Sequence, residues 1–447
     1  MTSSMRKHIL WLKQEIQSWT DEGIISSDQA QQLSARYNAI TTDNPWGKVI
    51  FSAIGALLIG LGVILFFAYN WEAMHRFTKL ALVLVAVIIA HGAGWHLSFR
   101  NATHDAIHNK NSQAQSSARL GESLHLLGSI LFGAGIWLIA QIYHIDEHYP
   151  NGILIWSLGA LAMAWALSSS LQALLAMALI GFWCGAEVFD FRRDLDWAPW
   201  VIAALVMPLA WRKNSPLLMF FSSVLFLLLL FFVSVFNDFE MVVHLLFILA
   251  VGFMSLAKLV PAFRRAELSG VLYGVGTLVY FSLLFAFTFT GVITDIYLNQ
   301  VNTLALVMYL LLPLCIVLGI GFVVWRQREQ LLPSSIDRID ASLKFLTLIA
   351  FMGSTLLTNS GMPAILFNVV MFVHSILYLL SGMEHVRWQR VAFGSFILAL
   401  LVFVRFLDLF DSLLLRSLSF VLLGIGLFVI GILFSRQKAS QEVSQHG

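Results

Sequence analysis

Long apolar runs follow one another along almost the whole chain, and they constrain its fold more than any other feature. A helix needs about 20 predominantly apolar residues to cross the hydrocarbon core of a bilayer. Apolar residues make up 59% of the chain and charged residues only 12%, whereas a soluble domain carries about 25% charged residues. The chain therefore has too little polar surface for a water-soluble fold. We predict an all-α, polytopic bundle of transmembrane helices.

The number of spans depends on one short run. The run 197–211 holds only 15 residues and contains Pro199 and Pro208. If it crosses, Lys and Arg divide 21 to 6 with both termini on the richer side, and if it does not cross they divide 10 to 17. Because Lys and Arg concentrate on the cytoplasmic side, we predict about 14 spans and cytoplasmic N- and C-termini. The thirteen longer runs lie near 48–69, 78–98, 120–142, 151–168, 170–189, 215–235, 239–259, 268–290, 301–325, 341–358, 361–381, 389–407 and 412–434.

The N-terminal residues predict a helical hairpin outside the membrane. Apolar residues recur at helical spacing between residues 9 and 19, and Gly23 is placed to end that helix. Ser26-Ser27-Asp28-Gln29 has the form of a capping box that opens a second helix. Residues 4–39 are too few to hold a substantial core alone. We expect them to pack on the membrane domain or to contact a second copy of the chain or a protein partner, with a docking or sensor module as the alternative.

These features divide the chain into two predicted parts. Residues 1–45 form the cytoplasmic hairpin, a domain of unknown function, and residues 46–447 form the multi-span transmembrane domain. The longest cytoplasmic loops are expected at 99–119 and 326–340. The mostly polar start of the chain carries no signal peptide, so the first span is expected to act as an uncleaved insertion signal.

Charge and cysteine content exclude several classes of protein. The formal net charge is only +2, so no strong field predicts binding to nucleic acid. Cys184 and Cys315 both lie inside apolar runs, which excludes a disulfide framework or a cysteine-based zinc site. The Gly-x-Gly pairs follow no strand, so they are not a nucleotide fingerprint. We predict no cofactor, and the lipid bilayer as the main partner.

Ionisable groups inside apolar runs are the first candidates for function, because they are costly at membrane depth. Glu122 and His125 lie one helical turn apart and fit a proton-coupling pair, since His titrates near neutral pH; alternatively, Glu122 reaches the headgroups. Arg405 and Asp408 have the same spacing and form either a self-neutralising pair or a charged lining for a polar or anionic substrate. The other candidate binding residues are Gln141, His144 and Glu187.

Further histidines carry weaker signals. His91, His244 and His374 interrupt apolar runs and are expected mainly to form hydrogen bonds between helices. The segment from His144 to His148 matches the zinc motif H-x-x-E-H. Pro150 follows at once, whereas zinc binding by this motif requires both histidines on one helix face. We therefore predict no metal site.

Glycine spacing gives two expectations about packing. The runs that start at Gly55 and Gly128 share the pattern G-x4-G-x-G, which fits either a parallel internal repeat or a chance similarity between glycine-rich helices. Gly270 and Gly274 lie at helix-packing spacing. We expect them to let neighbouring helices approach closely.

Three stretches carry a resemblance to a known family. They are LKQEIQSWTDEGIISSDQAQQL (Leu12–Leu33), ILFFAYNW (Ile64–Trp71), and GAGIWLIAQIYHI (Gly133–Ile145) followed by LIWSLGAL (Leu154–Leu161). They resemble predicted bacterial inner-membrane proteins that begin with a domain of unknown function, the DUF2157-type family. The resemblance covers roughly residues 9–170. It implies a location in a bacterial inner membrane and implies no activity.

Three functions stay open from the sequence. A transporter or flippase of a small polar or lipid-linked substrate fits the many spans and the ionisable groups within them. A non-catalytic membrane scaffold or envelope-stress sensor is the alternative. A membrane-embedded enzyme acting on a lipid precursor, with Glu122, His125 or His144 as acid-base groups, is less favoured. A polar cavity within the bundle favours transport, and a solid bundle favours a scaffold.

Overall fold

The computed structural model describes most of the chain, and every regular element it describes is a helix. This confirms the predicted all-α fold class. The described residues are 11–12, 15–33, 51, 54–55, 57–59, 61–62, 65, 74–108, 111–145, 148–234, 239–259, 266–295, 306–332, 334–354, 362–409, 421, 424–426 and 428–436.

Contacts between helices divide the chain into two compact units, residues 1–163 and residues 164–447. The boundary that the sequence predicts at residue 45 lies outside the described residues. In the first unit, residues 15–21 and 27–33 are helical. The backbone N–H of Ser26 donates to Gln29 Oε1 at 3.0 Å, and the N–H of Gln29 donates to Ser26 Oγ at 3.3 Å. With Gly23 at φ 73°, this confirms the predicted helix end and capping box.

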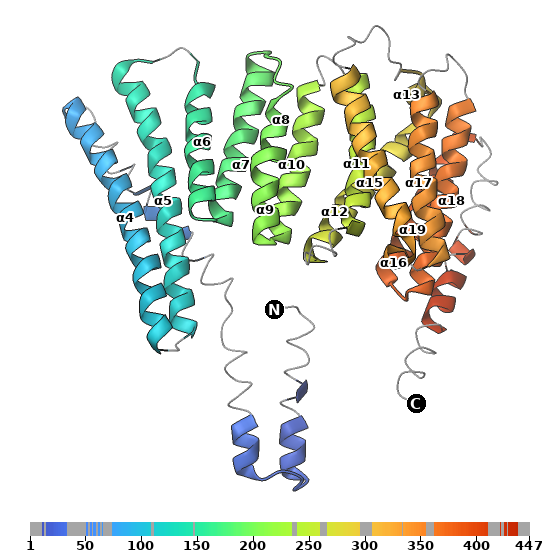
Figure 1. Ribbon diagram of the computed structural model, residues 1–447, viewed down its shortest axis with the longest axis horizontal. Coiled ribbons are helices and arrows are strands. Elements are labelled where there is room, and N and C mark those ends of the chain that lie inside the picture. The colour runs from blue at the N-terminus through green and yellow to red at the C-terminus, as the bar shows by residue number, and fades with distance from the viewer. Residues whose placement is uncertain are drawn as a thin grey trace. The chain divides into compact units, whose positions relative to one another are not determined.

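Two long helices, α4 (Arg76–His108) and α5 (Asn111–Tyr143), lie side by side (Figure 1). The described residues of the predicted connection 99–119 are helical and continue these two helices, and their place in the cytoplasm stays a prediction. The apolar part of α4 ends at Ser98 and that of α5 begins at Arg119. Hydropathy marks where a helix can leave the hydrocarbon, whereas backbone hydrogen bonds decide where it ends.

The next helix, α6 (Pro150–Ala166), packs on α5 through Trp156. The indole N–H donates to the carbonyl of Ser129 at 2.8 Å. A Cβ atom at Gly133 would lie 2.1 Å from the indole ring. The ring of Trp156 can therefore pack against α5 only because residue 133 is glycine. Two stretches that carry the family resemblance therefore pack against each other.

The second unit begins with five helical segments. They are α7 (Ser170–Gly185) with its π-helical extension η1 (Ala186–Asp190), α8 (Ala198–Val201), the π-helical η2 (Ile202–Val206), α9 (Met207–Lys213), and α10 (Pro216–Ser234). The predicted short span is thus a helical path from Ala198 to Lys213, roughly 24 Å long at 1.5 Å per residue. Its wide π turn directly precedes the turn of Pro208, whose ring conflicts with a regular α-helical turn.

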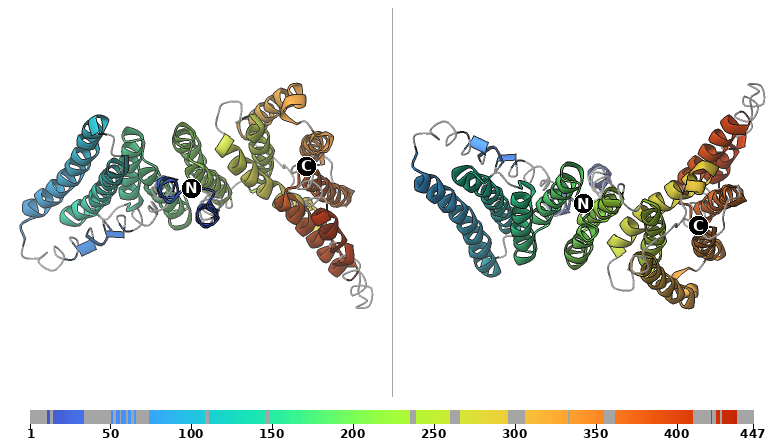
Figure 2. Two further views of the ribbon diagram at one scale, coloured as in Figure 1. Left: turned by 90° about the horizontal axis from the view of Figure 1, so that it is seen from below. Right: turned by 90° about the horizontal axis from the view of Figure 1, so that it is seen from above.

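Consecutive helices pair in the rest of the second unit, where α11 lies beside α12, and α18 lies beside α19 (Figures 1 and 2). Helix α17 packs against α11 and α18. The segments are α11 (Phe239–Leu259), α12 (Ala266–Phe287), α13 (Thr290–Asp295), η4 (Leu306–Leu311), α15 (Leu312–Arg326), α16 (Arg328–Leu331), α17 (Ser335–Ser354), α18 (Met362–Glu384) and α19 (Trp388–Leu409).

Aromatic side chains form the centre of this helix bundle. Phe287 stacks on Phe351 with ring centroids 4.2 Å apart, and Phe247 stacks on Tyr280 at 5.1 Å. Phe367 packs against the first pair. All five rings are fully buried. Buried aromatic pairs stabilise a fold beyond the area that they remove from solvent, so we call these five rings the aromatic cluster.

Eight helices in the described part of the chain are long and apolar enough to cross a membrane, and three shorter apolar helices accompany them. Helix α17 does not meet this criterion, because Asp337, Arg338, Asp340 and Lys344 occupy its first half. The count of 14 spans stays a prediction, since most of the run 48–69 lies outside the described residues.

Helix α12 packs tightly against α11 at Gly276. A Cβ atom there would lie 2.7 Å from the carbonyl oxygen of Ala250, a backbone atom that has no room to yield. At Gly270 and Gly274 a Cβ atom would meet nothing within 4 Å. The expectation that Gly270 and Gly274 make the packing surface is therefore wrong, because the helix turns these two positions away from its described neighbours.

We expect Gly276→Ala to destabilise the bundle by about 1–3 kcal/mol, the usual penalty of overpacking a tight contact. Gly274→Ala is the matched control and should leave stability unchanged or raise it slightly, since Ala favours helix over Gly. Thermal unfolding of the two purified variants in detergent measures the difference. Equal stability of the two variants would contradict the close approach.

Candidate functional site

Charged residues gather on one face of α17. Asp337, Asp340 and Lys344 lie at i, i+3 and i+7, so they share a stripe of the helix. Asp340 is only 8% exposed and Lys344 only 5% exposed. Charged side chains are almost never buried this deeply unless they are paired. The first half of α17 is therefore the most unusual segment of the described bundle.

A buried triad joins α17 to α18. The ammonium of Lys344 contacts Asp340 Oδ2, and the other carboxylate oxygen, Oδ1, lies 3.0 Å from His374 Nδ1. The second ring nitrogen of His374, Nε2, lies 2.9 Å from the hydroxyl of Tyr280. His374 and Tyr280 are fully buried. We refer to Asp340, Lys344 and His374 as the triad.

The carboxylate fixes the direction of these hydrogen bonds. An ionised Asp340 only accepts, so we assign the ring proton of His374 to Nδ1. Nε2 then accepts from the hydroxyl of Tyr280. The result is a directed chain from Tyr280 on α12 through His374 on α18 to Asp340 on α17.

Two tyrosines surround the ammonium of Lys344. Its Nζ lies 5.1 Å from the ring centroid of Tyr378 and 5.5 Å from that of Tyr273, within the range of cation–π attraction. It also donates to the hydroxyl of Tyr273 at 3.4 Å. The two tyrosine hydroxyls are 2.9 Å apart. Lys344 is thus held by one carboxylate, one hydroxyl and two ring faces.

A second polar group of contacts lies nearer the start of α17. Asp337 Oδ1 accepts from Arg390 Nη1 at 3.1 Å and from Ser381 Oγ at 2.7 Å. His385 lies 3.7 Å from the other oxygen of the same carboxylate. These contacts tie α17 to the end of α18 and to the start of α19. Both carboxylates of the stripe therefore have cationic partners.

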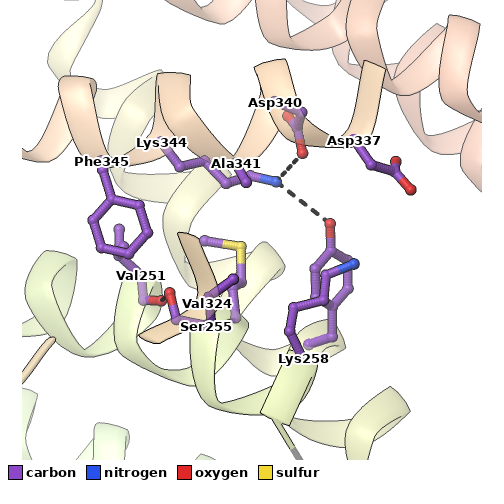
Figure 3. A pocket seen from close by; sticks show the side chains of 11 residues that line it. Val251, Ser255, Lys258, Val324, Asp337, Asp340, Ala341, Lys344 and Phe345 are labelled. Atoms are coloured by element: carbon purple, nitrogen blue, oxygen red, sulfur yellow. Dashed lines mark hydrogen bonds and ion pairs between the residues drawn. The ribbon is translucent and has the colours of Figure 1, made fainter. Parts of the chain in front are cut away.

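A hollow of about 30 Å³, room for a single water molecule, adjoins the triad. Figure 3 shows Asp337, Asp340 and Lys344 of α17 along one side and Lys258 of α11 on the opposite side. We call this space the α17 hollow. Its other lining residues are Val251, Met254, Ser255, Tyr273, Val324, Ala341 and Phe345.

Lys258 differs from the other charged residues of the hollow. Its Nζ lies 4.9 Å from the ring centroid of Tyr273, and the side chain is partly exposed. Among the residues that the structure describes, no carboxylate forms an ion pair with it, whereas Asp337, Asp340 and Lys344 are all paired. Because Asp340 pairs with Lys344, and Asp337 pairs with Arg390 outside the lining, Lys258 is left without a carboxylate partner among the described residues.

In the first unit, the candidate residue His125 contacts a second histidine, and its predicted pairing with Glu122 stays a prediction. His125 Nδ1 lies 3.1 Å from His91 Nδ1 of α4, and Glu122 lies one turn earlier on α5, partly buried. A side chain at Gly128 would come within 2.6 Å of the His91 ring, and one at Gly94 within 3.0 Å of the His125 ring. Each imidazole thus lies over a glycine of the facing helix.

Gln141 and His144 are exposed at the end of α5. His144 follows the last residue of α5 with φ 51°, a left-handed conformation that ends the helix. It therefore shares no helix face with His148, as the zinc motif would require. Asp146 and Glu147 lie outside the described residues.

Glu187 is buried in the π-helical turn η1. The indole N–H of Trp183 donates to its Oε1 at 3.3 Å, and Arg193 Nε lies 3.7 Å from its Oε2. Trp183 also packs against Trp197, with ring centroids 5.5 Å apart. These contacts fix the end of α7 and the turn that follows it.

Arg405 binds the C-terminal end of α12. Its Nη2 donates to the carbonyl of Thr288 at 2.9 Å and to the hydroxyl of Thr288 at 2.8 Å. Its guanidinium lies 4.6 Å from the ring centroid of Phe289. A cation is favourable at a helix C-terminus. The side chain of Asp408 lies outside the described residues, so the predicted pair with Arg405 stays a prediction.

None of the seven candidates from the sequence lines the α17 hollow within the described structure. His374 interrupts an apolar run and forms the expected hydrogen bonds between helices. Asp340 and Lys344 were missed, because they fall where a polar loop gives way to an apolar run. Their i, i+4 spacing, together with Asp337 three residues earlier, was the available signal.

Comparison with known proteins supports the family resemblance. Residues 17–173 match the model of a family described as predicted membrane protein (DUF2157). The match confirms the resemblance for this part of the chain and covers the α4–α5 pair, whereas the triad lies outside it. No curated protein and no solved structure matches the chain.

We expect Lys344→Met to destabilise the protein by about 3–5 kcal/mol, since it leaves a buried carboxylate without its cation. The double variant Asp340→Asn/Lys344→Met removes both charges and should recover most of that loss. Chemical unfolding of the purified variants in detergent measures both. A double variant no more stable than Lys344→Met would contradict a mutually dependent pair.

Proposed function

We propose that this membrane protein transports a small polar solute across the membrane, and that the triad with the α17 hollow is its binding centre. The observation that carries the proposal is a buried, paired set of charges beside a small hollow in a bundle of apolar helices. Ionisable groups at such positions are costly and commonly mark the paths of substrates or ions.

Stability alone is a poor reason for the triad. Replacing a buried ion pair by apolar side chains of similar volume is often neutral or stabilising. The bundle also has a large apolar core, including the aromatic cluster, that holds the same helices together. A pair of charges kept beside a hollow therefore fits a role in binding better than a role in folding.

The order of polar and apolar residues along α12 supports a solute path that opens at the hollow and is closed by the aromatic cluster. Along α12, Tyr273 lines the hollow, Tyr280 joins the triad to the aromatic cluster, and Phe287 lies inside that cluster. Thr288 follows and is held by Arg405. The hollow thus lies near one end of these helices, with stacked aromatic rings between it and the other end.

Movement of helix α17 would change the access of a solute to the α17 hollow. Asp337 binds α18 and α19 through polar contacts, while Asp340 and Lys344 bind α18 and α12. Polar contacts can be exchanged for a solute or for water, whereas close-packed apolar contacts cannot. We propose that solute binding loosens α17 from these partners.

We propose a bacterial inner membrane as the location, with both termini in the cytoplasm. The excess of Lys and Arg in the loops on one side supports this orientation. The α17 hollow lies near the end of α11 and the start of α17, which this orientation turns towards the cytoplasm.

The N-terminal hairpin supports a separate role as a contact surface for a second copy or a protein partner. Trp11 is 55% exposed and Ile24 is 65% exposed on a segment too small for a core of its own. Exposed large apolar side chains on a capped hairpin fit protein contacts. This role is compatible with transport by the membrane domain.

Unlabelled metabolite profiling of a deletion strain tests the proposed function. We expect a small polar solute to change in abundance, and the wild-type gene to restore it. Asp340→Asn/Lys344→Met should not restore it, because the binding charges are gone although the pair is neutral. Ser342→Ala, on the same helix and bonded only to the carbonyl of Arg338 in the described structure, is the matched control and should restore it. Full restoration by the double variant at wild-type membrane levels would contradict the proposal.

The orientation has its own test. We expect a cysteine placed at Arg328 to react with an impermeant thiol reagent only from the cytoplasmic side, and one placed at Arg193 only from the outside. Cys184 and Cys315 are first replaced by Ala. If both introduced cysteines react from the same side, the number of crossings between them is even and the charge argument is wrong.

A further inference from the structure

We propose that the α17 hollow binds the carboxylate group of a small solute, and that Asp340 takes up one proton when the carboxylate binds. The inference rests on the proposed function and names the class of solute and the ion that accompanies it. It depends on Lys258, which has no carboxylate partner among the described residues, on the paired state of Lys344, and on the contact between Asp340 and His374.

The charges around the hollow select an anion. Lys258 and Lys344 both lie near the ring of Tyr273, so two ammonium groups border the same small space. Asp340 balances Lys344, and Arg390 balances Asp337. Lys258 therefore attracts an anionic group into the space between the two lysines.

A carboxylate fits this space better than a larger anion. The hollow itself has room for about one water molecule, and a carboxylate is larger, so it reaches Lys344 only by taking the position of the Asp340 carboxylate. Lys344 already binds a carboxylate, that of Asp340. A solute carboxylate can take the place of Asp340 with similar geometry and charge.

Binding of this kind requires a proton. A solute carboxylate that pairs with Lys344 leaves the buried carboxylate of Asp340 without its cation, which is strongly unfavourable in an apolar surrounding. Lys258 is partly exposed on the opposite side of the hollow and does not replace that cation. Protonation of Asp340 restores neutrality. Before binding, Lys344 is paired with the Asp340 carboxylate; after binding, it is paired with the solute carboxylate, and Asp340 is a neutral acid. One anion and one proton enter together, so the net charge of the site is unchanged.

The position of His374 supports this exchange. Its Nδ1–H donates to Asp340 Oδ1 at 3.0 Å and keeps its proton throughout. When Lys344 pairs with the solute carboxylate, Asp340 Oδ2 loses its cation and takes up a proton that enters from solvent together with the solute. The titratable and charged groups around Asp340 are Asp337 and Lys344 on α17, Lys258 on α11, Tyr273 and Tyr280 on α12, His374 and Tyr378 on α18, and Arg390 on α19 through Asp337.

Titration of the purified wild-type chain with acetate tests the proposal without any substitution. We expect acetate to bind with the uptake of one proton, measured from binding heats in buffers of different ionisation enthalpy. Its affinity should fall about tenfold for each unit of rising pH. Acetate binding without proton uptake would overturn the exchange, and no acetate binding would overturn the site.

Two comparisons make the test specific. Chloride is the competing small anion, and binding of chloride with equal affinity and equal proton uptake would overturn the assignment to a carboxylate. Lys258→Gln should weaken acetate binding about tenfold to hundredfold, the effect of losing one charge-assisted contact. Lys258→Arg keeps the cation and should retain most of the binding; if both variants bind like wild type, Lys258 has no role.

The variant Asp340→Asn tests proton uptake separately from anion binding. This change leaves Lys344 without its carboxylate partner and removes the group that takes up the proton, so acetate should bind at least as tightly as in wild type and independently of pH. If this variant does not fold, the wild-type titration still decides the proposal. pH-dependent binding by a folded Asp340→Asn variant would place the proton elsewhere.

The two proposals fail in different ways. If the metabolite profile depends on the triad but acetate does not bind with a proton, transport stands and the ligand class is wrong. If acetate binds with a proton but the profile is the same with and without the gene, the binding site stands and transport is wrong.

Discussion

The buried ion pair between Asp340 and Lys344 is the interaction on which the arrangement of α17 depends. Neither charge is stable in an apolar bundle without the other, so the two must lie on one helix face at i, i+4. The remaining hydrogen-bonding capacity must also be used, which draws His374 of α18 and Tyr273 of α12 to the same point. The buried pair thus adds directed polar contacts that fix the register of α17 against helices that the apolar core already holds together.

The apolar part of the fold is predictable from the sequence, because burial and length are local properties of each run. The helical class, the capping box at Ser26 and the glycine end of the first hairpin helix all follow from patterns of a few residues. The ends of α4 and α5 do not follow from hydropathy, since a helix continues into water wherever its backbone bonds are satisfied. Gly276 likewise becomes a packing residue only once α11 lies against it.

The candidate site is less predictable, because it joins residues far apart in the chain. His374 was visible as a break in an apolar run, whereas its partner Asp340 was indistinguishable from a loop acid before α17 and α18 were placed together. Each of the seven candidate residues is polar or charged and differs from its apolar neighbours in the sequence. In the structure, Glu187 and Arg405 fix turns and helix ends, and His125 meets His91, a partner on another helix that no spacing rule identifies.

The packing of His91 and His125, each over a glycine of the other helix, limits how α4 and α5 can move in the first unit. Each ring occupies the space above a glycine of the opposite helix, so sliding α4 along α5 by one turn, about 5.4 Å, would unseat both rings and break their hydrogen bond together. The two helices are therefore locked against sliding at this level. When the polar ends of α4 and α5 are displaced along the helix axes, the two helices therefore move together as one rigid pair.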